Sequence, residues 1–214
     1  MSTEADKAIT LRVPSKYVSP STSSSTFTNP PLEWLHRTWC VTHSTLQMWR
    51  RARNVRITYT PLAPEATSSG GSPRPRVDDL VEYEKSTGKG GVKTVEGIDT
   101  AASEDGSTGS WDWKGKGVLG FVSSHWEVMG WGERPVEGGE GGGGGTERWA
   151  VTWFAPTLFT KEGIDLYSDR KEGMSPALAE EILAGLKVLG AKEIVEMVEA
   201  DMKEVEIKLP WMEK

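Results

Sequence analysis

Hydrophobic and polar residues alternate with a period of two along much of the chain, most clearly between residues 34 and 60. In the first half of that stretch, Trp39, Val41 and His43 fall on one face, with smaller residues between them. In the second half, the residues that share a face are Val55, Ile57 and Tyr59. A period of two that is rich in aromatic and β-branched residues predicts β-strands. We therefore expect two strands here, joined by a basic connection that contains Arg50.

The same alternation returns later in the chain, so more strands follow. We expect them near residues 77–85, 92–100, 111–131, 148–155 and 157–168. A helical region comes next, because Ser175 suits an N-cap and Pro176 suits the first helical position. Its apolar stripe consists of Leu178, Ile182, Leu186 and Leu189. The chain then ends in a predicted strand whose inward residues are Val205, Ile207 and Leu209.

Low-complexity stretches separate these elements. Residues 1–31 are rich in Ser, Thr and Pro and predict a disordered tail, because such a segment buries too little apolar surface to offset the entropy of ordering. Residues 61–76, 101–110 and 132–146 predict flexible loops. The remainder, residues 32–214, is expected to form a single domain.

The order of the elements has no β-α-β rhythm, which disfavours a parallel sheet. We expect a mainly β protein, an antiparallel up-and-down β-barrel of about eight to ten strands with a short helical segment before the last strand. The last strand is expected to close the barrel against the first. An eight-stranded barrel of this kind has an interior just large enough for one small ligand.

Trp39, early in the first strand, and the order of elements from about residue 32 to residue 211 resemble the calycin group of lipocalin-like barrels. The chain departs from the lipocalin pattern at Arg37, where that pattern has Gly two residues before the Trp. It is also similar to small intracellular fungal proteins of lipocalin-like type, some of them linked to secondary metabolism. The resemblance implies binding of an apolar or amphipathic small molecule inside the barrel.

Composition narrows the class of protein. The chain has 214 residues, a net charge of −6 and a single Cys, and its pI is near 5.3. The acidic balance argues against a nucleic-acid partner. A single Cys fits a reducing compartment, and no apolar run suits a signal peptide or a membrane span, so we expect a cytoplasmic protein without a membrane partner. Its oligomeric state stays open.

Ten Trp residues make an aromatic cavity the first candidate site. In a cavity of this kind one face of each strand forms the wall, although the sequence does not say which face of residues 118–131 points inward. The Trp residues could instead simply fill the barrel, each His could be structural, and the basic connection could be a solvated turn. The candidate ligand-binding residues are Trp39, Val41, His43, Arg50, Tyr59, His125 and Trp126.

Acidic residues and the few His and Cys residues are the remaining candidates for polar chemistry. Asp78, Asp79, Glu82 and Glu84 are expected on an outer, solvated face opposite Val77, Val81 and Tyr83. Glu127 or Asp165 could tune a His that acts as a general acid or base. Three scattered His and one Cys have no metal-ligand spacing. The His near the C-terminus that holds haem in nitrobindin-like calycins is absent, so we expect neither a metal nor another cofactor.

These observations predict binding of a small apolar or aromatic molecule in a Trp-lined barrel. An alternative is a cofactor-free cyclase or isomerase that acts on a secondary metabolite in the same cavity, with His43, Arg50, Tyr59 or His125 as hydrogen-bond donors. A third hypothesis is an interaction or scaffold protein that uses the basic surface between residues 50 and 56 or the acidic helices.

Overall fold

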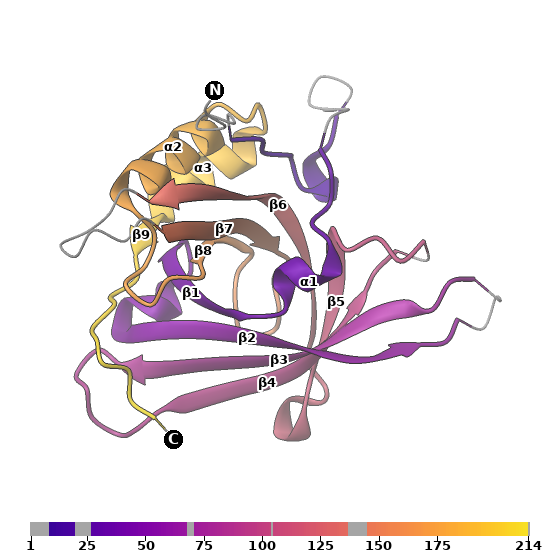
Figure 1. The fold of residues 1–214 in the computed structure, drawn as a ribbon, viewed down its shortest axis with the longest axis horizontal. Coiled ribbons are helices and arrows are strands. Elements are labelled where there is room, and N and C mark those ends of the chain that lie inside the picture. Colours follow the sequence, from indigo (N-terminus) through magenta and orange to yellow (C-terminus); the bar gives the residue numbers. More distant parts are fainter. Residues whose placement is uncertain (1–8, 20–26, 68–70, 104, 137–144, 214) are drawn as a thin grey trace.

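The computed structural model describes residues 9–19, 27–67, 71–103, 105–136 and 145–213, and a closed antiparallel barrel dominates it (Figure 1). Each strand pairs with its neighbour in sequence, and the first strand also pairs with the eighth, which closes the ring. The barrel strands are β1 (Thr38–Ser44), β2 (Ala52–Glu65), β3 (Arg74–Lys85), β4 (Lys93–Ala101), β5 (Ser110–Gly115), β6 (Ser123–Val136), β7 (Gly145–Phe154) and β8 (Gly163–Ser168).

The predicted fold class, a mainly β up-and-down barrel with helices before the last strand, is confirmed, but the closing strand differs from the expected one. Val41 of β1 pairs with Tyr167 of β8, whereas β9 (Lys203–Glu204) is only two residues long. The pairing of β1 with β2 ends at Cys40, which pairs with Arg56. β9 then pairs with the freed edge of β1.

The side chains of the strands form two separate apolar cores. One fills the barrel and includes Trp39, Tyr59 and Trp111. The other lies outside it, where β7 residues such as Trp153 pack with the apolar stripes of α2 (Pro176–Lys187) and α3 (Lys192–Asp201). Burying an apolar stripe in this way is what stabilises a short amphipathic helix. Among the described residues, no helix is long and apolar enough to cross a membrane.

The N-terminal segment packs on the outside of the barrel. Within the predicted tail, residues 9–19 include the short 3₁₀ helix η1 (Ser15–Tyr17), and Val13 is buried in the outer core. Leu11 forms a bridge with Gly130 of β6. The N-terminal segment therefore extends the outer core.

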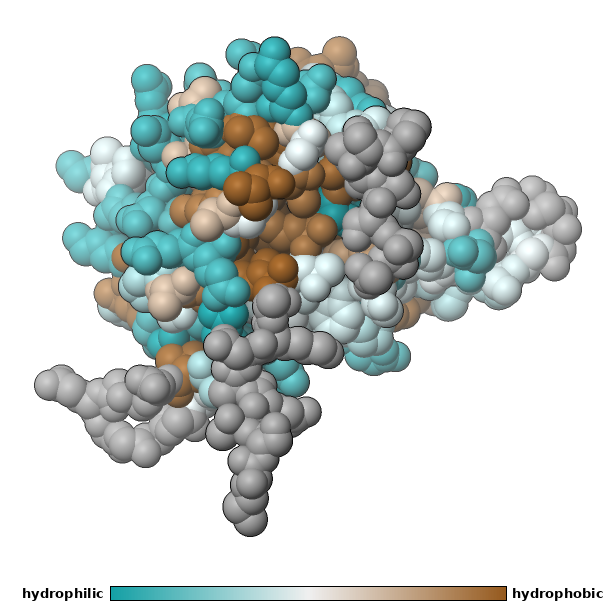
Figure 2. All heavy atoms as spheres, turned by 90° about the horizontal axis from the view of Figure 1, so that it is seen from above, coloured by the Kyte–Doolittle hydropathy of each residue, from teal (hydrophilic) through white to brown (hydrophobic). Residues whose placement is uncertain are grey.

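Seen from above, hydrophobic side chains gather near the centre of this face of the molecule, and hydrophilic ones surround them (Figure 2).

One end of the barrel, where β1 begins, is covered by residues 27–35, which include α1 (Leu32–Leu35). The Leu35 carbonyl accepts a hydrogen bond from the indole of Trp39 at 3.2 Å. Trp131 in turn donates to the carbonyl of Thr28 at 2.7 Å. We call this the capped end. At the opposite end, the 3₁₀ helix η2 (Gln47–Arg51) links β1 to β2 and places Trp49 against Tyr83.

Candidate functional site

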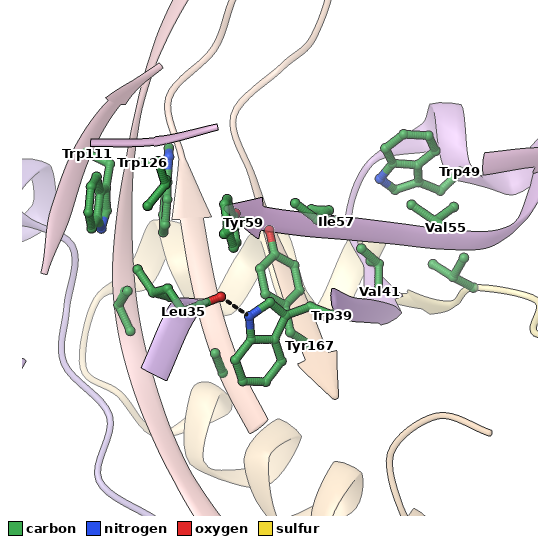
Figure 3. Close-up of a cluster of buried hydrophobic side chains, with 14 of the residues drawn as sticks. Leu35, Trp39, Val41, Trp49, Val55, Ile57, Tyr59, Trp111, Trp126 and Tyr167 are labelled. Carbon is green, nitrogen blue, oxygen red and sulfur yellow. Dashed lines mark hydrogen bonds between the residues drawn. The ribbon is translucent and has the colours of Figure 1, made fainter. Parts of the chain in front are cut away.

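The barrel interior has a stacked aromatic wall. The ring centroids of Tyr59 and Trp126 lie 5.7 Å apart with an interplanar angle of 18°, and those of Trp126 and Trp111 lie 5.8 Å apart at 15°. Figure 3 shows these three rings in succession, with Trp39 and Tyr167 nearby. All five side chains are buried. Stacked rings of this kind offer flat apolar surface to an aromatic ligand.

Two carboxyl groups share this interior face. Tyr59 pairs with Asp79 of β3, and Asp79 pairs with Gly97 of β4, two residues from Asp99. Because side chains two residues apart in a strand point to the same side, Asp99 also points inward. Asp79 is 7% exposed and Asp99 is fully buried. We call Asp79 and Asp99 the carboxyl pair.

Each member of the carboxyl pair has a nearby indole donor and one oxygen without a partner. Trp126 Nε1 donates to Asp99 Oδ1 at 2.7 Å. The indole of Trp113 hydrogen-bonds Asp79 and lies over Gly97. Asp79 Oδ1 and Asp99 Oδ2 are buried and have no hydrogen-bond partner among the described residues. A buried polar atom without a partner needs an explanation, such as a bound water or ligand.

Burial changes the acidity of the pair. It raises the pKa of Asp79 to about 7, although the hydrogen bond from Trp113 opposes the rise. Burial also raises the pKa of Asp99 well above its ordinary value, and the charge of Asp79 adds to that rise. Since both carboxyls prefer the protonated form, the pair can hold a proton near neutral pH.

A second polar group lies in the barrel towards β7 and β8. The hydroxyls of Tyr59 and Tyr167 hydrogen-bond each other. Burial raises the pKa of Asp165 to about 7, while hydrogen bonding from Ser44 and the charge of Arg50 oppose the rise. Asp165 Oδ1 and Arg50 Nη1 are buried without a hydrogen-bond partner within the described part of the chain.

Side chains are less fully buried at the end of the barrel opposite the capped end. Inward-facing side chains near that end of β3, β4, β5 and β7 are only partly buried, namely Val81, Tyr83, Val95, Trp113 and Phe154. The loops around them carry exposed hydrophobic residues, namely Val118, Phe121, Leu158 and Phe159. The rings of Phe121 and Phe159 pack edge to face, with their centroids 6.3 Å apart. We call this end the open mouth, and Asp79 lies one inward position deeper than Val81.

The structure places four of the predicted ligand-binding residues inside the barrel: Trp39, Val41, Tyr59 and Trp126. Arg50 instead lies at the end of β1, where its guanidinium donates to the carbonyl of Ser44 at 2.9 Å and to the carbonyl of Asp201. It therefore ties η2 to the end of α3. Its positive charge acts on Asp165 in the interior.

Contrary to the prediction, His43 lies outside the barrel. The register between β1 and β8 shifts between Val41 and His43, so that His43 pairs with Leu166, a member of the outer core, and Ser44 pairs with Asp165. The bulge reverses the alternation on which the prediction rested. Burial lowers the pKa of His43.

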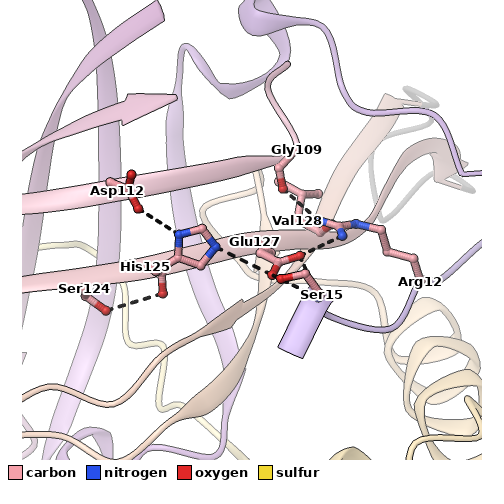
Figure 4. A network of polar contacts seen from close by, with 8 residues as sticks. All are labelled: Arg12, Ser15, Gly109, Asp112, Ser124, His125, Glu127 and Val128. Carbon is pink, nitrogen blue, oxygen red and sulfur yellow. Dashed lines mark hydrogen bonds and ion pairs between the residues drawn. The ribbon is translucent and has the colours of Figure 1, made fainter. Parts of the chain in front are cut away.

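His125 also lies on an outer face, because it pairs with Asp112 while its neighbour Trp126 points inward. Its ring contacts Asp112 Oδ1 at 2.8 Å and Glu127 Oε1 at 3.6 Å (Figure 4). Hydrogen bonding to Glu127 raises the pKa of His125. Glu127 also holds Arg12 at 2.7 Å, so this network attaches the N-terminal segment to β6. The predicted pairing of His125 with Glu127 is present, but away from the interior.

The predicted outer, solvated face of β3 requires two corrections. One is that Glu84 is fully buried and accepts hydrogen bonds from Arg53 and Asn54. The other is that Asp79 points inward, together with Val77 and Val81, whereas Asp78 and Glu82 point outward. Alternation alone predicts that Asp79 points inward, because residues 77, 79 and 81 lie on the same face of the strand. Asp99 was not predicted as a site residue, although it shares the parity of Val95 and Ala101 on β4.

A separate depression of about 700 Å³ lies on the outer wall, beneath the C-terminal residues 209–213. The Trp211 ring lies over the guanidinium of Arg56 at 5.0 Å. Arg56 already donates to Glu82, to the carbonyl of Asn54 and to the carbonyl of Met212. Because these donors are used within the protein, the interior carboxyl pair is the stronger candidate site.

No protein-family model and no curated protein matches this chain. Lobster apocrustacyanin A1 is a solved structure similar to it, with 8% identity, 84% of this chain and 81% of that chain covered, and a TM-score of 0.49. The siderocalin Ex-FABP is another, with 11% identity, 83% and 96% covered, and a TM-score of 0.48. Both likenesses concern the fold alone.

The decisive structural feature is the closure of sequential antiparallel strands by β1 and β8, with helices packed on the outside near the C-terminus. The fold is lipocalin-like. Within this lipocalin-like barrel, the stacked aromatic wall, the carboxyl pair and the open mouth define the candidate site.

Proposed function

We propose that this protein binds a small apolar or aromatic molecule inside its Trp-lined barrel. The observation that carries the proposal is the stacked wall of Tyr59, Trp126 and Trp111 beside two buried carboxylate oxygens that have no partner. Aromatic surface with a few convergent polar groups is typical of small-molecule sites. A barrel of eight strands has room for one such molecule.

The ligand enters through the open mouth in this proposal. The partly buried side chains of Val95 and Trp113 line that end, and exposed hydrophobic residues surround it. The capped end is less suitable, because residues 27–35 lie over it and Leu35 is 1% exposed. The exposed Phe121 and Phe159 would contact an apolar ligand before it reaches the wall.

Blocking the mouth tests the proposal. A panel of aromatic and aliphatic compounds is first titrated against the full chain, with Trp fluorescence and thermal stability as readouts. Val95→Phe adds a ring inside the mouth and is expected to weaken binding of any hit at least about tenfold. The matched control Val188→Phe adds the same ring at the end of α2, at a residue that is 81% exposed, and should leave affinity unchanged.

Two results would contradict binding in the barrel. If no compound changes fluorescence or melting temperature, the aromatic residues only fill the core. If Val95→Phe and Val188→Phe weaken a hit equally, the compound binds outside the barrel.

A cofactor-free cyclase or isomerase is a second candidate, which one observation favours. Burial raises the pKa of Asp79 to about 7, which suits a group that both donates and accepts protons near neutral pH. Incubating a bound compound with the protein and analysing the products by mass spectrometry tests for turnover. Asp79→Asn should abolish turnover, and an unchanged rate would exclude this role for Asp79.

A further inference from the structure

We propose that the ligand of the barrel is a small aromatic amine whose protonated nitrogen lies between Asp79 and Asp99. This inference rests on the proposed function, since it names the chemical class of the molecule that the barrel binds. It depends on the charge, the hydrogen-bonding capacity and the aromatic surroundings of the carboxyl pair.

The charge around the pair is unbalanced. The charged groups that act on Asp99 are Asp79 and Asp112, and both are acidic. Lys116 acts on Asp79, but its ammonium group already contacts the carboxylate of Asp78. A cationic ligand can replace the protons of two buried carboxyls that lie close together without their own cation, because its charge favours their ionised form, whereas an anionic ligand disfavours that form.

The number of free hydrogen-bond acceptors also fits an ammonium group. The indoles of Trp113 and Trp126 serve one carboxyl each, and one oxygen of each carboxyl remains without a partner. An ammonium group offers three N–H donors and no acceptor, so it can donate to both free oxygens at once. A neutral alcohol offers one donor and satisfies only one of them.

The surrounding rings favour the same ligand. Trp126, which donates to Asp99, also stacks between Tyr59 and Trp111, so the carboxyl pair lies beside the aromatic wall. A cation near the face of a Trp or Tyr ring gains cation–π attraction, and the aromatic part of the ligand can stack on the same wall. An aliphatic amine lacks the second contribution.

Matched probes test the chemical class on the unmodified protein. We would measure affinities by calorimetry for 2-phenylethylamine, 2-phenylethanol and phenylacetate, and for the corresponding naphthyl and indolyl compounds. The amine of each ring size is expected to bind at least about tenfold more tightly than the alcohol. The carboxylate is expected to bind most weakly, because it meets the buried negative charge.

Variants then locate the contact. Asp99→Asn should lower amine affinity about tenfold and leave alcohol affinity unchanged. The control Glu96→Gln removes a carboxylate from the exposed outer face of the same strand and should change neither affinity. If Asp99→Asn does not fold, the comparison of amine with alcohol on the unmodified protein still decides the question.

Each outcome has a definite meaning. Equal affinity of amine and alcohol at every ring size, or tightest binding of the carboxylate, overturns the amine assignment and leaves barrel binding in place. Absence of binding by every amine overturns the assignment as well. If, in addition, the broader compound panel gives no hit, the proposed function fails with it.

Discussion

Asp79→Asn should make the protein more stable at neutral and mildly alkaline pH, although it removes a buried polar side chain from the barrel. In the folded protein, burial raises the pKa of Asp79 from 3.8 to about 7. In the unfolded chain, the carboxyl ionises at its ordinary pKa. The folded state must therefore either keep a proton on Asp79 or hold a buried negative charge.

The sign follows from proton binding. A carboxyl whose folded pKa is raised favours folding fully below its unfolded pKa, and this contribution is lost as pH rises through the folded pKa. A rise of about three pKa units corresponds to roughly 4 kcal/mol at about 1.36 kcal/mol per unit. Asn carries no charge, and its amide can donate to the free oxygen of Asp99, so Asp79→Asn should avoid most of this loss.

Urea denaturation of the wild type and Asp79→Asn, followed by Trp fluorescence between about pH 4 and about pH 8, measures the effect. Subtracting the unfolding free energy of the wild type from that of the variant isolates the contribution of Asp79. Groups whose pKa is lowered by folding, such as Glu127, contribute equally to both proteins and cancel. We expect the variant to gain roughly 2–4 kcal/mol relative to the wild type across this range, mostly above about pH 5. A pH-independent difference would refute the argument that Asp79 is buried beside a second carboxyl.

Three further predictions concern positions outside the pair. Gly97→Ala places a Cβ 2.1 Å from Trp113 Nε1 and should shift that ring, with a loss of about 1–3 kcal/mol and a change in Trp emission, whereas Gly145→Ala has open space and should be neutral. Glu127 has its pKa lowered to about 2, so its contribution is lost as pH falls, and Glu127→Gln should make the N-terminal segment more sensitive to proteolysis at neutral pH. His43→Ala should leave ligand affinity in calorimetry unchanged, because His43 pairs with an outer-core residue.

Much of the barrel could be predicted because its strands obey simple alternation. Trp39 and Tyr59 lie inside as expected, since large aromatic residues on one face of a strand are most stable when buried. The inward position of Trp126 was not determined by the sequence, because both faces of its strand are partly apolar. The helical region was predictable for a similar reason. Ser175 and Pro176 mark its start, and a periodic apolar stripe identifies the side that packs on the barrel.

The failures occur where the backbone departs from regular alternation. The register shift after Val41 turns His43 outward, and the pairing of β1 with β2 ends at Cys40, which leaves the edge that β9 fills. Local sequence does not determine such bulges, because they depend on which strands become neighbours. The same dependence explains why Tyr167, rather than a residue of the last strand, pairs with Val41.

The carboxyl pair was missed for a different reason. Asp79 has the parity of its hydrophobic neighbours, but acidic residues in a strand are normally interpreted as solvated, since burying a charge is costly. A buried pair of acids departs from the rule that charged residues in a strand face solvent. Such departures are concentrated at functional sites. The position of Asp79 was readable from alternation, whereas its proximity to Asp99 required the pairing of β3 with β4.

A functional and a structural role for the carboxyl pair predict different amine affinities. Because burial raises the pKa of Asp99 in either case, Asp99→Asn should raise stability above neutral pH, and if the pair only supports the fold it should leave amine affinity unchanged. If the pair recognises a cation, the same substitution should also lower amine affinity. Denaturation and calorimetry on this one variant measure both quantities. A protein that loses both stability and affinity would show that the carboxylate is needed to hold Trp126 in place, and the amine would then have to be tested against Asp79 alone.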